Sequence, residues 1–264
     1  MAARIRIRFH QQLNDFLPAS MQNSDIACTV EEHRSIKDLI ESLGVPHPEV
    51  DLVFINGESA DFDYLLKDGD RINVYPALAA TDISDPEVST GSPLLHWQPQ
   101  ATGEARFVLD VHLGRLAAYL RMLGFDALYR NDYHDPELAD ISARENRILL
   151  TCDRRLLMRK QIEYGYFVRS RQPKQQLLEV LSRFDLFNKI RPFSRCMHCN
   201  GLTRPVDKKT IEHRLLPKTR NYYDSFYQCQ NCGKIYWQGS HYQKMENMIK
   251  NLGADIPQPE NKPA

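Results

Sequence analysis

The sequence predicts an α/β protein in three parts: an N-terminal α+β domain, a central domain with a parallel sheet, and a small cysteine-containing ribbon. Residues 1–80 place short strand-like runs around one helical pattern, residues 104–188 alternate strands with helices, and residues 189–250 hold four cysteines in two pairs. We expect residues 81–103 to form a linker and residues 251–264 to form a flexible tail.

Composition limits the class of protein. Hydrophobic residues make up 42% and charged residues 26% of the 264 residues, as in ordinary globular proteins. No apolar run is long enough to span a membrane, and the start, MAARIRIRFH, lacks the apolar core of a signal peptide. We therefore expect a cytoplasmic protein that has no membrane partner.

The 34 basic and 34 acidic residues are unevenly distributed along the chain. Residues 1–103 hold 7 Lys+Arg against 16 Asp+Glu, a balance of −9, whereas residues 104–250 hold 26 against 16, a balance of +10. Such a basic region either meets a polyanion or is a set of solvated faces, and charge alone does not decide between these two interpretations.

The N-terminal elements follow the order β-β-α-β-β. RIRIRFH (4–10) alternates apolar and polar residues as a half-buried strand does, and DIACTV (25–30) can pair with it. RSIKDLIESLG (34–44) has one apolar helical face and ends at a glycine. VDLVFING, with its Asn-Gly turn, and LLKDGDRINVYPAL supply two more strands. This order with short connections predicts a β-grasp domain.

The stretch from 81 to 103, TDISDPEVSTGSPLLHWQPQATG, has the composition of a linker because it is rich in Pro, Gly, Ser and Thr. Leu94, Leu95 and Trp97 are its apolar cluster. An exposed cluster of this kind would be costly, so we expect it to dock on a neighbouring surface.

The central domain begins with a short apolar strand at 107–109. The next helix carries Leu113, Leu116, Ala117, Leu120 and Leu123 on one face and ends at Gly124. FDALYR is a second strand, DPELADISAREN is a helix with Asp135 as its N-cap, and RILLT is a third strand that ends in Cys152-Asp153. This alternation predicts a parallel sheet with helices on both faces.

Carboxylates follow the strands of this predicted sheet. Asp110, Asp132 and Asp153 lie just beyond carboxyl ends, where open α/β sheets bind ligands, and Asp135 starts the next helix. Converging carboxylates repel one another unless a cation neutralises them, and a hard ion such as Mg²⁺ prefers oxygen ligands. Each aspartate also has a local explanation: Asp135 as a helix cap, Asp132 as a turn residue and Asp153 as a cap of the next short helix. Asp110 is the hardest to explain in this way.

Several arginines are candidates for contacting phosphate. Arg154 and Arg155 stand beside Asp153 and are the better candidates. Arg115 and Arg121 lie on the helix after Asp110. For this second pair, a solvated helix flank is the favoured interpretation over a phosphate contact.

Four of the six cysteines form a paired C-x₂-C arrangement, CMHCNG and CQNCG. A tetrahedral Zn²⁺ site takes four such thiolates, so we expect a structural zinc ion held by Cys196, Cys199, Cys229 and Cys232. The spacer of 29 residues is long, but a ribbon with a long hairpin tolerates it. Disulfides are unfavourable in a cytoplasmic setting. Cys28 and Cys152 stand alone and are expected to be buried small hydrophobes.

Histidines and aromatic residues surround these cysteines. His198, His213 and His241 are possible substitute ligands, but four thiolates already close the site. Tyr236, Trp237 and Tyr242 are expected to form the small core of the ribbon, with stacking on bases as the alternative.

The chain from 106 to about 245 resembles the Mut7-C RNase family, a branch of the PIN-like nucleases. FVLDVHLGRLAAYLRMLGFDALYRND, DPELADISARENRILLTCDRRLL and KQQLLEVLSRFDL carry the resemblance. It implies a PIN-like fold and a catalytic cluster of Asp110, Asp135 and Asp153, which would bind Mg²⁺ or Mn²⁺. PIN nucleases often carry another acid after the next strand, where this chain has Arg169 and Arg171.

Residues 1 to 80 resemble ubiquitin-like domains related to sulfur carriers, through FINGE (54–58) and DGDRINVYP (68–76). The carriers end in a free Gly-Gly, whereas this strand continues into PALAATDI. The resemblance therefore implies a docking module for a protein partner, and we expect the module to be dispensable for chemistry.

Taken together, these features predict a metal-dependent ribonuclease that hydrolyses RNA phosphodiester bonds at an Asp-bound Mg²⁺ or Mn²⁺, with a structural Zn²⁺. The alternative is a non-catalytic zinc-ribbon adaptor that binds RNA and keeps the nuclease fold as a scaffold.

Overall fold

The structure is a computed structural model that describes residues 2–31, 33–76, 96, 104–240, 243–244 and 247. Leu94, Leu95, Trp97 and Tyr242 lie outside these residues, as do the predicted tail and all of the predicted linker except His96. The chain packs into two compact units: Met1–Gly114 with Tyr129–Arg169, and Arg115–Leu128 with Ser170–Ala264.

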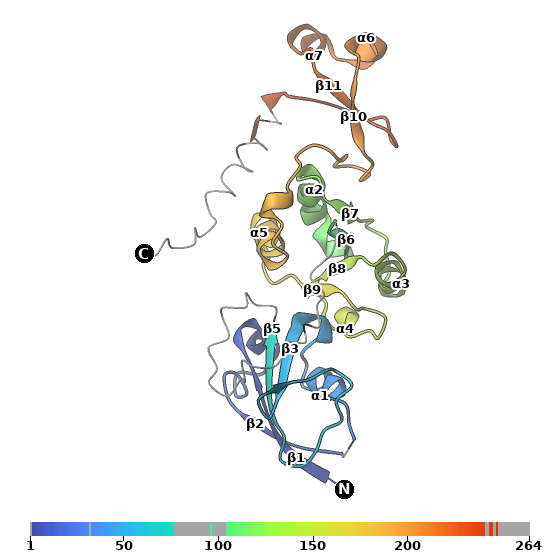
Figure 1. Cartoon of the computed structure of the whole chain (residues 1–264). Coiled ribbons are helices and arrows are strands. Elements are labelled where there is room, and N and C mark those ends of the chain that lie inside the picture. The colour runs from blue at the N-terminus through green and yellow to red at the C-terminus, as the bar shows by residue number, and fades with distance from the viewer. Residues whose placement is uncertain are drawn as a thin grey trace, which may run out of the picture. The chain divides into compact units, whose positions relative to one another are not determined.

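The N-terminal part of the first unit is a β-grasp sheet, as predicted (Figure 1). Its strands β1 (Ala2–Phe9), β2 (Ile26–Glu31), β3 (Val50–Ile55), β4 (Glu58–Ser59) and β5 (Arg71–Pro76) have the order β2-β1-β5-β3-β4. β1 and β5 are parallel, and the other neighbours are antiparallel. Helix α1 (Ile36–Ser42) and two 3-10 turns, η1 (Gln11–Phe16) and η2 (His47–Glu49), complete this part.

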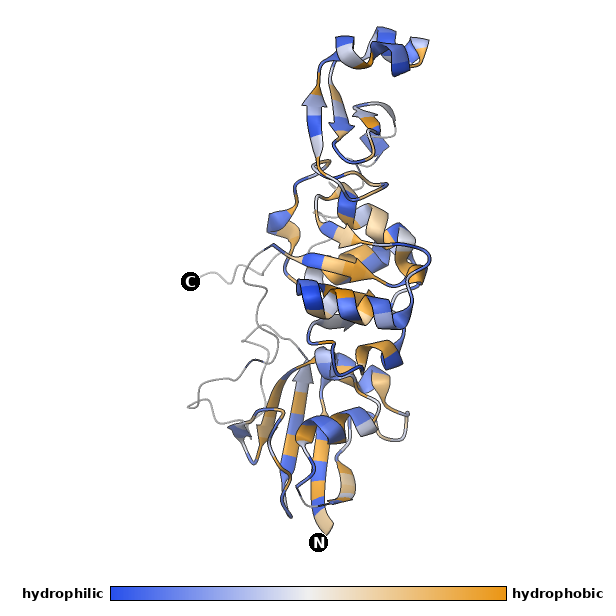
Figure 2. Ribbon diagram, turned by 90° about the vertical axis from the view of Figure 1, so that its right-hand side faces the viewer, coloured by the Kyte–Doolittle hydropathy of each residue, from blue (hydrophilic) through white to orange (hydrophobic). Residues whose placement is uncertain are grey.

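Residue alternation explains how this sheet forms its core. Successive residues of β1 are exposed and buried in turn, and its ribbon alternates hydrophilic and hydrophobic residues (Figure 2). The side chain of Ser35 caps α1 by accepting a hydrogen bond from the N–H of Asp38 (3.1 Å). The predicted Asn-Gly turn after β3 is present, since Asn56 and Gly57 both have positive φ (54° and 87°).

The central domain contains the predicted parallel strands. β6 (Arg106–Leu109), β8 (Ile148–Thr151) and β9 (Gly165–Phe167) pair in parallel, with Leu109 opposite Leu150 and Thr151 opposite Phe167. Helices α3 (Asp135–Glu145) and α4 (Arg154–Leu157) lie between these strands in the chain, and a further short strand is β7 (Asp126–Leu128). The apolar residues predicted for the first helix are all almost completely buried: Leu113, Leu116, Ala117, Leu120 and Leu123.

Two local predictions about this domain are wrong. The N-cap of α3 is His134, so Asp135 is the first helical residue, followed by Pro136. β7 ends at Leu128, shorter than predicted, and Asp132 therefore lies in the following turn and not directly after a strand.

The second unit contains α2 (Gly114–Met122, from Arg115 on), β7, α5 (Pro173–Arg183) and the ribbon. Strands β10 (Thr203–Val206), β11 (Phe226–Cys229) and β12 (Ile235–Trp237) form an antiparallel sheet in that order. The long spacer between the cysteine pairs carries two short helices, α6 (Lys208–Ile211) and α7 (Pro217–Tyr222). Three more 3-10 turns are η3 (Val111–Leu113), η4 (Phe187–Lys189) and η5 (Glu212–Arg214).

None of the helices that the structure describes combines the length and the apolar composition that a membrane span requires.

Gly124 is a position in the second unit that requires glycine. Its φ is +95°, and its N–H donates to the Arg121 carbonyl (3.0 Å) while the N–H of Phe125 donates to the Leu120 carbonyl (3.0 Å), so α2 ends in a left-handed turn. A Cβ at this position would collide with the backbone oxygen of Arg191 and lie 2.7 Å from the Ser194 hydroxyl.

We expect Gly124→Ala to lower the free energy of unfolding by roughly 2–4 kcal/mol, because left-handed strain and overpacking add up. Gly69→Ala is the matched control, since Gly69 also has positive φ (+89°) but an added Cβ there would meet no atom within 4 Å. Strain alone should cost the control about 1–2 kcal/mol. Urea unfolding followed by circular dichroism measures both, and equal losses would contradict the proposed clash.

Candidate functional site

The candidate site begins at the carboxyl end of β6. The N–H of Asp110 continues the strand pairing by donating to the Leu150 carbonyl (3.0 Å), which places Asp110 next to the end of β8. The hydroxyl of Thr151 donates to Asp110 Oδ2 (2.7 Å), and the Asp110 side chain is buried, with 7% of its surface exposed. A buried carboxylate needs such a donor or a cation beside it.

Thr151 connects the two main aspartates. Its hydroxyl oxygen, besides donating to Asp110, accepts a hydrogen bond from the N–H of Asp153 (2.9 Å), and Thr151 itself is completely buried. Thr151 was not predicted from the sequence as a site residue. The signal that could have found it was a hydroxyl residue at the end of a strand, two residues before an aspartate.

Asp153 caps α4. Its Oδ1 accepts a hydrogen bond from the N–H of Arg155 (2.7 Å), so the local explanation as a helix cap is confirmed. The residue is exposed, in contrast to Asp110. A capping role and a role in binding a cation do not exclude each other, because a carboxylate has two oxygens.

The other two aspartates lie apart from this pair in their contacts. Asp135 is exposed in the first turn of α3, where a negative charge is favourable toward the helix dipole. Asp132 forms an ion pair with Arg130 (2.6 Å), and the hydrogen bond from this arginine holds the pKa of Asp132 below its ordinary value. Among the residues described, the four cysteines are the one group of three or more side chains placed to hold a metal ion, and Asp110, Asp135 and Asp153 do not form such a group.

Binding of a hard divalent ion by Asp110 and Asp153 stays a prediction. Mg²⁺ is commonly bound through one or two carboxylates and keeps several waters, so it does not require a third protein ligand. The Thr151 hydroxyl orients one carboxylate and the backbone of the other. Outer contacts of this type fix the direction of the ligand oxygens.

The two predicted phosphate contacts differ in their surroundings. Arg154 donates to two backbone carbonyls, those of Phe16 (3.0 Å) and Asp15 (3.1 Å), so its guanidinium is already engaged. Arg155 is exposed, and no ion pair of its side chain is found in the part of the chain that the structure describes. Phosphate binding by either arginine stays a prediction.

The four predicted zinc ligands lie together. The Sγ atoms of Cys196, Cys199, Cys229 and Cys232 are all within 4.8 Å of one another. The Cys196–Cys232 and Cys199–Cys229 sulfur distances are 3.6 and 3.4 Å. Zn–S bonds of about 2.3 Å in a tetrahedron place sulfurs roughly 3.8 Å apart, so the four thiols fit a structural Zn²⁺.

The cysteine environment favours thiolate at one position. Burial opposes ionisation of Cys196, but hydrogen bonds from the Tyr236 hydroxyl (3.0 Å) and from the N–H groups of Cys199 and His198 outweigh it and lower its pKa to about 6. Burial raises the pKa of Cys199 to about 12. Zn²⁺ takes thiolates as ligands, so loading this site would release protons.

Tyr236 and Trp237, the two of these aromatic residues that the structure describes, are partly buried in the ribbon. Tyr236 contacts Cys196, and the Trp237 ring lies 6.5 Å from the rings of Phe226 and Tyr223. Cys152, in contrast, is exposed and Cys28 is only partly buried, so the prediction of two buried cysteines is wrong.

Arg121 fastens the first cysteine pair to α2. It is 5% exposed and donates to the carbonyls of Ala127 (2.8 Å), Met197 (3.2 Å) and His198 (3.0 Å). Met197 and His198 are the residues between Cys196 and Cys199. Both sequence interpretations of Arg121, a solvated flank and a phosphate contact, are therefore wrong.

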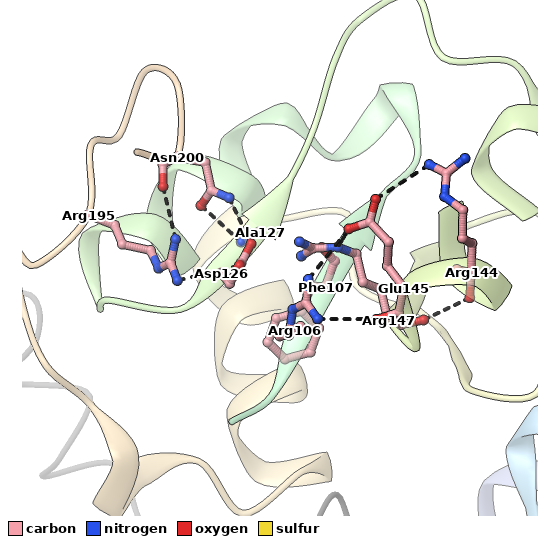
Figure 3. A network of polar contacts seen from close by, with 10 residues as sticks. Arg106, Phe107, Asp126, Ala127, Arg144, Glu145, Arg147, Arg195 and Asn200 are labelled. Atoms are coloured by element: carbon pink, nitrogen blue, oxygen red, sulfur yellow. Dashed lines mark hydrogen bonds and ion pairs between the residues drawn. The ribbon is translucent and has the colours of Figure 1, made fainter. Parts of the chain in front are cut away.

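Asn200 provides a second attachment of the same cysteine pair, to β7 (Figure 3). Its Oδ1 accepts from the N–H of Ala127 (3.1 Å), and its Nδ2 donates to Asp126 Oδ1 (2.8 Å). Arg195 adds an ion pair to Asp126 (3.4 Å) and a hydrogen bond to the Asn200 carbonyl (3.0 Å). The turn that carries Cys196 and Cys199 is thus held by polar contacts that do not involve the four thiols.

We expect the purified protein to contain one zinc ion per chain, and Cys199→Ser to lose it. Because the binding energy of a structural zinc is folding energy, this variant should also lose protection of the ribbon against proteolysis. Cys152→Ser is the matched control, since its thiol is exposed and outside the ligand group. Elemental analysis after metal-free purification gives the answer, and zinc-free wild-type protein would exclude this site.

Two solved structures are similar to a part of this chain that makes up less than a third of its length. A solution structure of the Haloferax volcanii HVO 2177 protein is 22% identical, with a TM-score of 0.25, and the match covers 30% of this chain and 87% of that one. A structure from Pyrococcus furiosus described as "molybdopterin converting factor, subunit 1" is 17% identical, with a TM-score of 0.23, over 29% of this chain and 99% of that one. No curated protein matches the chain.

Family models match both main parts of the chain. The Mut7-C ubiquitin model matches residues 2–82, and the Mut7-C RNAse domain model matches residues 105–249, which is more than half of the chain. The second match includes the candidate aspartates, Thr151 and all four zinc-site cysteines. The chain therefore belongs to the Mut7-C RNAse family.

Proposed function

We propose that this protein is a metal-dependent ribonuclease that hydrolyses RNA phosphodiester bonds at the Asp110–Asp153 site. The observation that carries the proposal is the contact of Thr151 with both aspartates at the carboxyl ends of β6 and β8. This is the edge at which parallel sheets bind ligands, and it lies in a domain that matches the Mut7-C RNAse model. The basic balance of residues 104–250 favours a polyanionic substrate.

Each side chain has a distinct part in this proposal. Asp110 and Asp153 would hold a Mg²⁺ or Mn²⁺ ion, which would neutralise phosphate charge and supply an activated water for in-line attack. The Thr151 hydroxyl donates to Oδ2 of Asp110. In this proposal, that contact orients the carboxylate of Asp110 so that its other oxygen, Oδ1, is available to the ion. Arg155, exposed beside Asp153, contacts the phosphate backbone.

Asp135 has a smaller part. It is exposed in the first turn of α3 and is outside any three-residue ligand group. We propose that Asp135 would not be a direct ligand of the ion.

The remaining features fit a cytoplasmic RNA-processing role. Zn²⁺ at the four cysteines stabilises the ribbon and takes no part in chemistry, because four protein ligands leave no open position. The N-terminal domain, whose charge is opposite to that of the rest, is the proposed contact for a protein partner.

A non-catalytic RNA-binding adaptor is the second candidate. The observation that favours it is that the three aspartates do not share one tight ligand group. Binding that survives EDTA, without cleavage in Mg²⁺ or Mn²⁺, would support the adaptor. Sequencing the RNA ends that the purified protein leaves in Mn²⁺ would support the nuclease and give its mode of cutting.

We expect Asp153→Asn to reduce RNA cleavage by more than about a hundredfold, because outer contacts alone contribute ten- to a hundredfold at metal sites. RNA affinity should be unchanged or higher, since the change removes a negative charge near the phosphate backbone. Asparagine caps helices as well as aspartate does, so α4 should persist. If Asp153→Asn cleaved RNA at the wild-type rate in saturating Mg²⁺, the proposed mechanism would be excluded.

The matched control is Asp207→Asn. Asp207 caps α6 in the same manner, with Oδ1 accepting from the N–H of Lys209 (2.9 Å), but it lies in the ribbon. Asp110→Asn should resemble Asp153→Asn, and the double variant should be little worse, because both serve one ion. Full activity of Asp135→Asn would exclude Asp135 as a ligand.

A further inference from the structure

A polar interface joins the N-terminal domain to β9 and α4, all within the first compact unit. Glu49, the last residue of η2, is its central side chain and is 1% exposed. Oε1 accepts a hydrogen bond from the N–H of Phe167 (2.6 Å), and Oε2 pairs with the guanidinium of Arg169 (2.7 Å).

Glu49 requires partners from the central domain. A carboxylate removed this far from water is strongly unfavourable unless it is paired and hydrogen-bonded. Both partners found for it belong to β9 or the residues just after it, more than a hundred positions away in the chain. If the N-terminal domain did not dock on the central domain, the Glu49 carboxylate would lack both of these partners.

Arg169 is held from the same domain by a second acid. It also pairs with Asp15 (3.1 Å) and donates to the Phe167 carbonyl (2.9 Å). Burial of the guanidinium opposes its charge, but Glu49 and Asp15 outweigh this and raise the pKa of Arg169. Arg169 is one of the two arginines found where PIN nucleases often carry another acid.

His47 adds a third buried contact. It is 6% exposed, with Nε2 at 2.6 Å from the Ile162 carbonyl oxygen and Nδ1 at 2.6 Å from Glu41 Oε1. The segment that leads into β9 is thus contacted by a side chain of η2, two residues before Glu49.

Arg154 connects the interface with the candidate site. This residue directly follows Asp153, and its guanidinium donates to the carbonyls of Phe16 and Asp15 while it lies over the rings of Phe16 (5.0 Å) and Phe167 (5.8 Å). From the other side, the N–H of Val168 donates to the Thr151 carbonyl (2.8 Å). Arg154, on one side of Asp153, therefore bonds directly to the N-terminal domain. Thr151, on the other side, bonds to Val168, the neighbour of the Phe167 that Glu49 contacts.

We infer that the ubiquitin-like domain positions the Asp153 end of the central domain, with Glu49 and Arg154 as the two positioning side chains. The inference rests on the proposed nuclease function for its consequence in catalysis, but not for the docking itself. It is the reverse of the expectation from sequence that this domain is dispensable for chemistry.

The first test asks whether the docking is built into the chain. A protease site placed between residues 84 and 93, in the predicted linker, allows the two parts to be separated covalently after folding. We expect the cut wild-type protein to elute as one species in size-exclusion chromatography and the cut Glu49→Ala variant to elute as two. Separation of the cut wild-type parts would overturn the inference.

The second test measures the position of Asp153 without metal or RNA. In the uncut chain, hydrogen exchange of the α4 amides should be about tenfold faster in Glu49→Ala than in wild type, since opening of the helix cap controls it. Glu58→Ala is the matched control, because Glu58 is an exposed acid of the same domain. Unchanged exchange in Glu49→Ala would exclude a positioning role.

The third test connects the interface to chemistry. RNA cleavage by Glu49→Ala should show a kcat about tenfold lower with an unchanged KM, as expected when a contact behind a metal ligand is lost. Unchanged kcat would contradict positioning of the catalytic site. If wild-type protein cleaves no RNA, the proposed function fails, and the exchange measurement still decides the inference.

Discussion

The parallel pairing of β6 with β8 is the constraint on which the candidate site depends. Leu109 lies opposite Leu150. The next residues, Asp110 just after β6 and Thr151 at the end of β8, therefore lie at the same edge of the sheet. The register is fixed by side chains that are fully buried on these strands: Phe107, Val108, Leu109, Leu149 and Leu150. A slip by one residue would turn each of them to the other face and would separate Asp110 from the Thr151 hydroxyl. The chemistry at the edge is thus specified by apolar packing that contains no functional group.

The strands were predictable from sequence, and the polar contacts between them were not. Short apolar runs that alternate with amphipathic helices indicate parallel strands, and parallel strands bring their carboxyl ends together. The hydrogen bond from Thr151 to Asp110 could not be predicted in this way. The two residues are 41 positions apart, and a hydroxyl at the end of a strand has many possible acceptors. The N-cap of α3 differs from the prediction by one residue, because both His134 and Asp135 can precede Pro136 in a first turn. Helix caps depend on backbone angles that a residue pattern does not specify.

The zinc site and its surroundings show the same contrast. Two C-x₂-C pairs predict their own partners, because four thiolates complete a tetrahedron irrespective of the fold around them. The role of Arg121 could not be predicted from the sequence. Its position on the helix was predicted correctly, but the cysteine pair that covers it comes 76 residues later in the chain. Asn200 has φ of +67°, a conformation that asparagine tolerates, and its amide then reaches Asp126 and Ala127 on β7 (Figure 3). The turn that carries Cys196 and Cys199 is therefore attached to β7, in the same unit, through neutral and ionic hydrogen bonds.

The charge distribution has a further meaning once Glu49 and Arg169 are considered together. Counted along the chain, the acidic N-terminal domain and the basic remainder suggest two surfaces that face different partners. The buried pair shows that some of this opposite charge is used internally, at 1% exposure for Glu49. Without the N-terminal domain, Arg169 would lose both of these acidic partners, Glu49 and Asp15, at a position next to Val168, whose N–H donates to the Thr151 carbonyl. A cation at this position competes electrostatically with any metal ion at Asp110 and Asp153. The electrostatics of the proposed site thus depend on a domain that contributes no ligand to it.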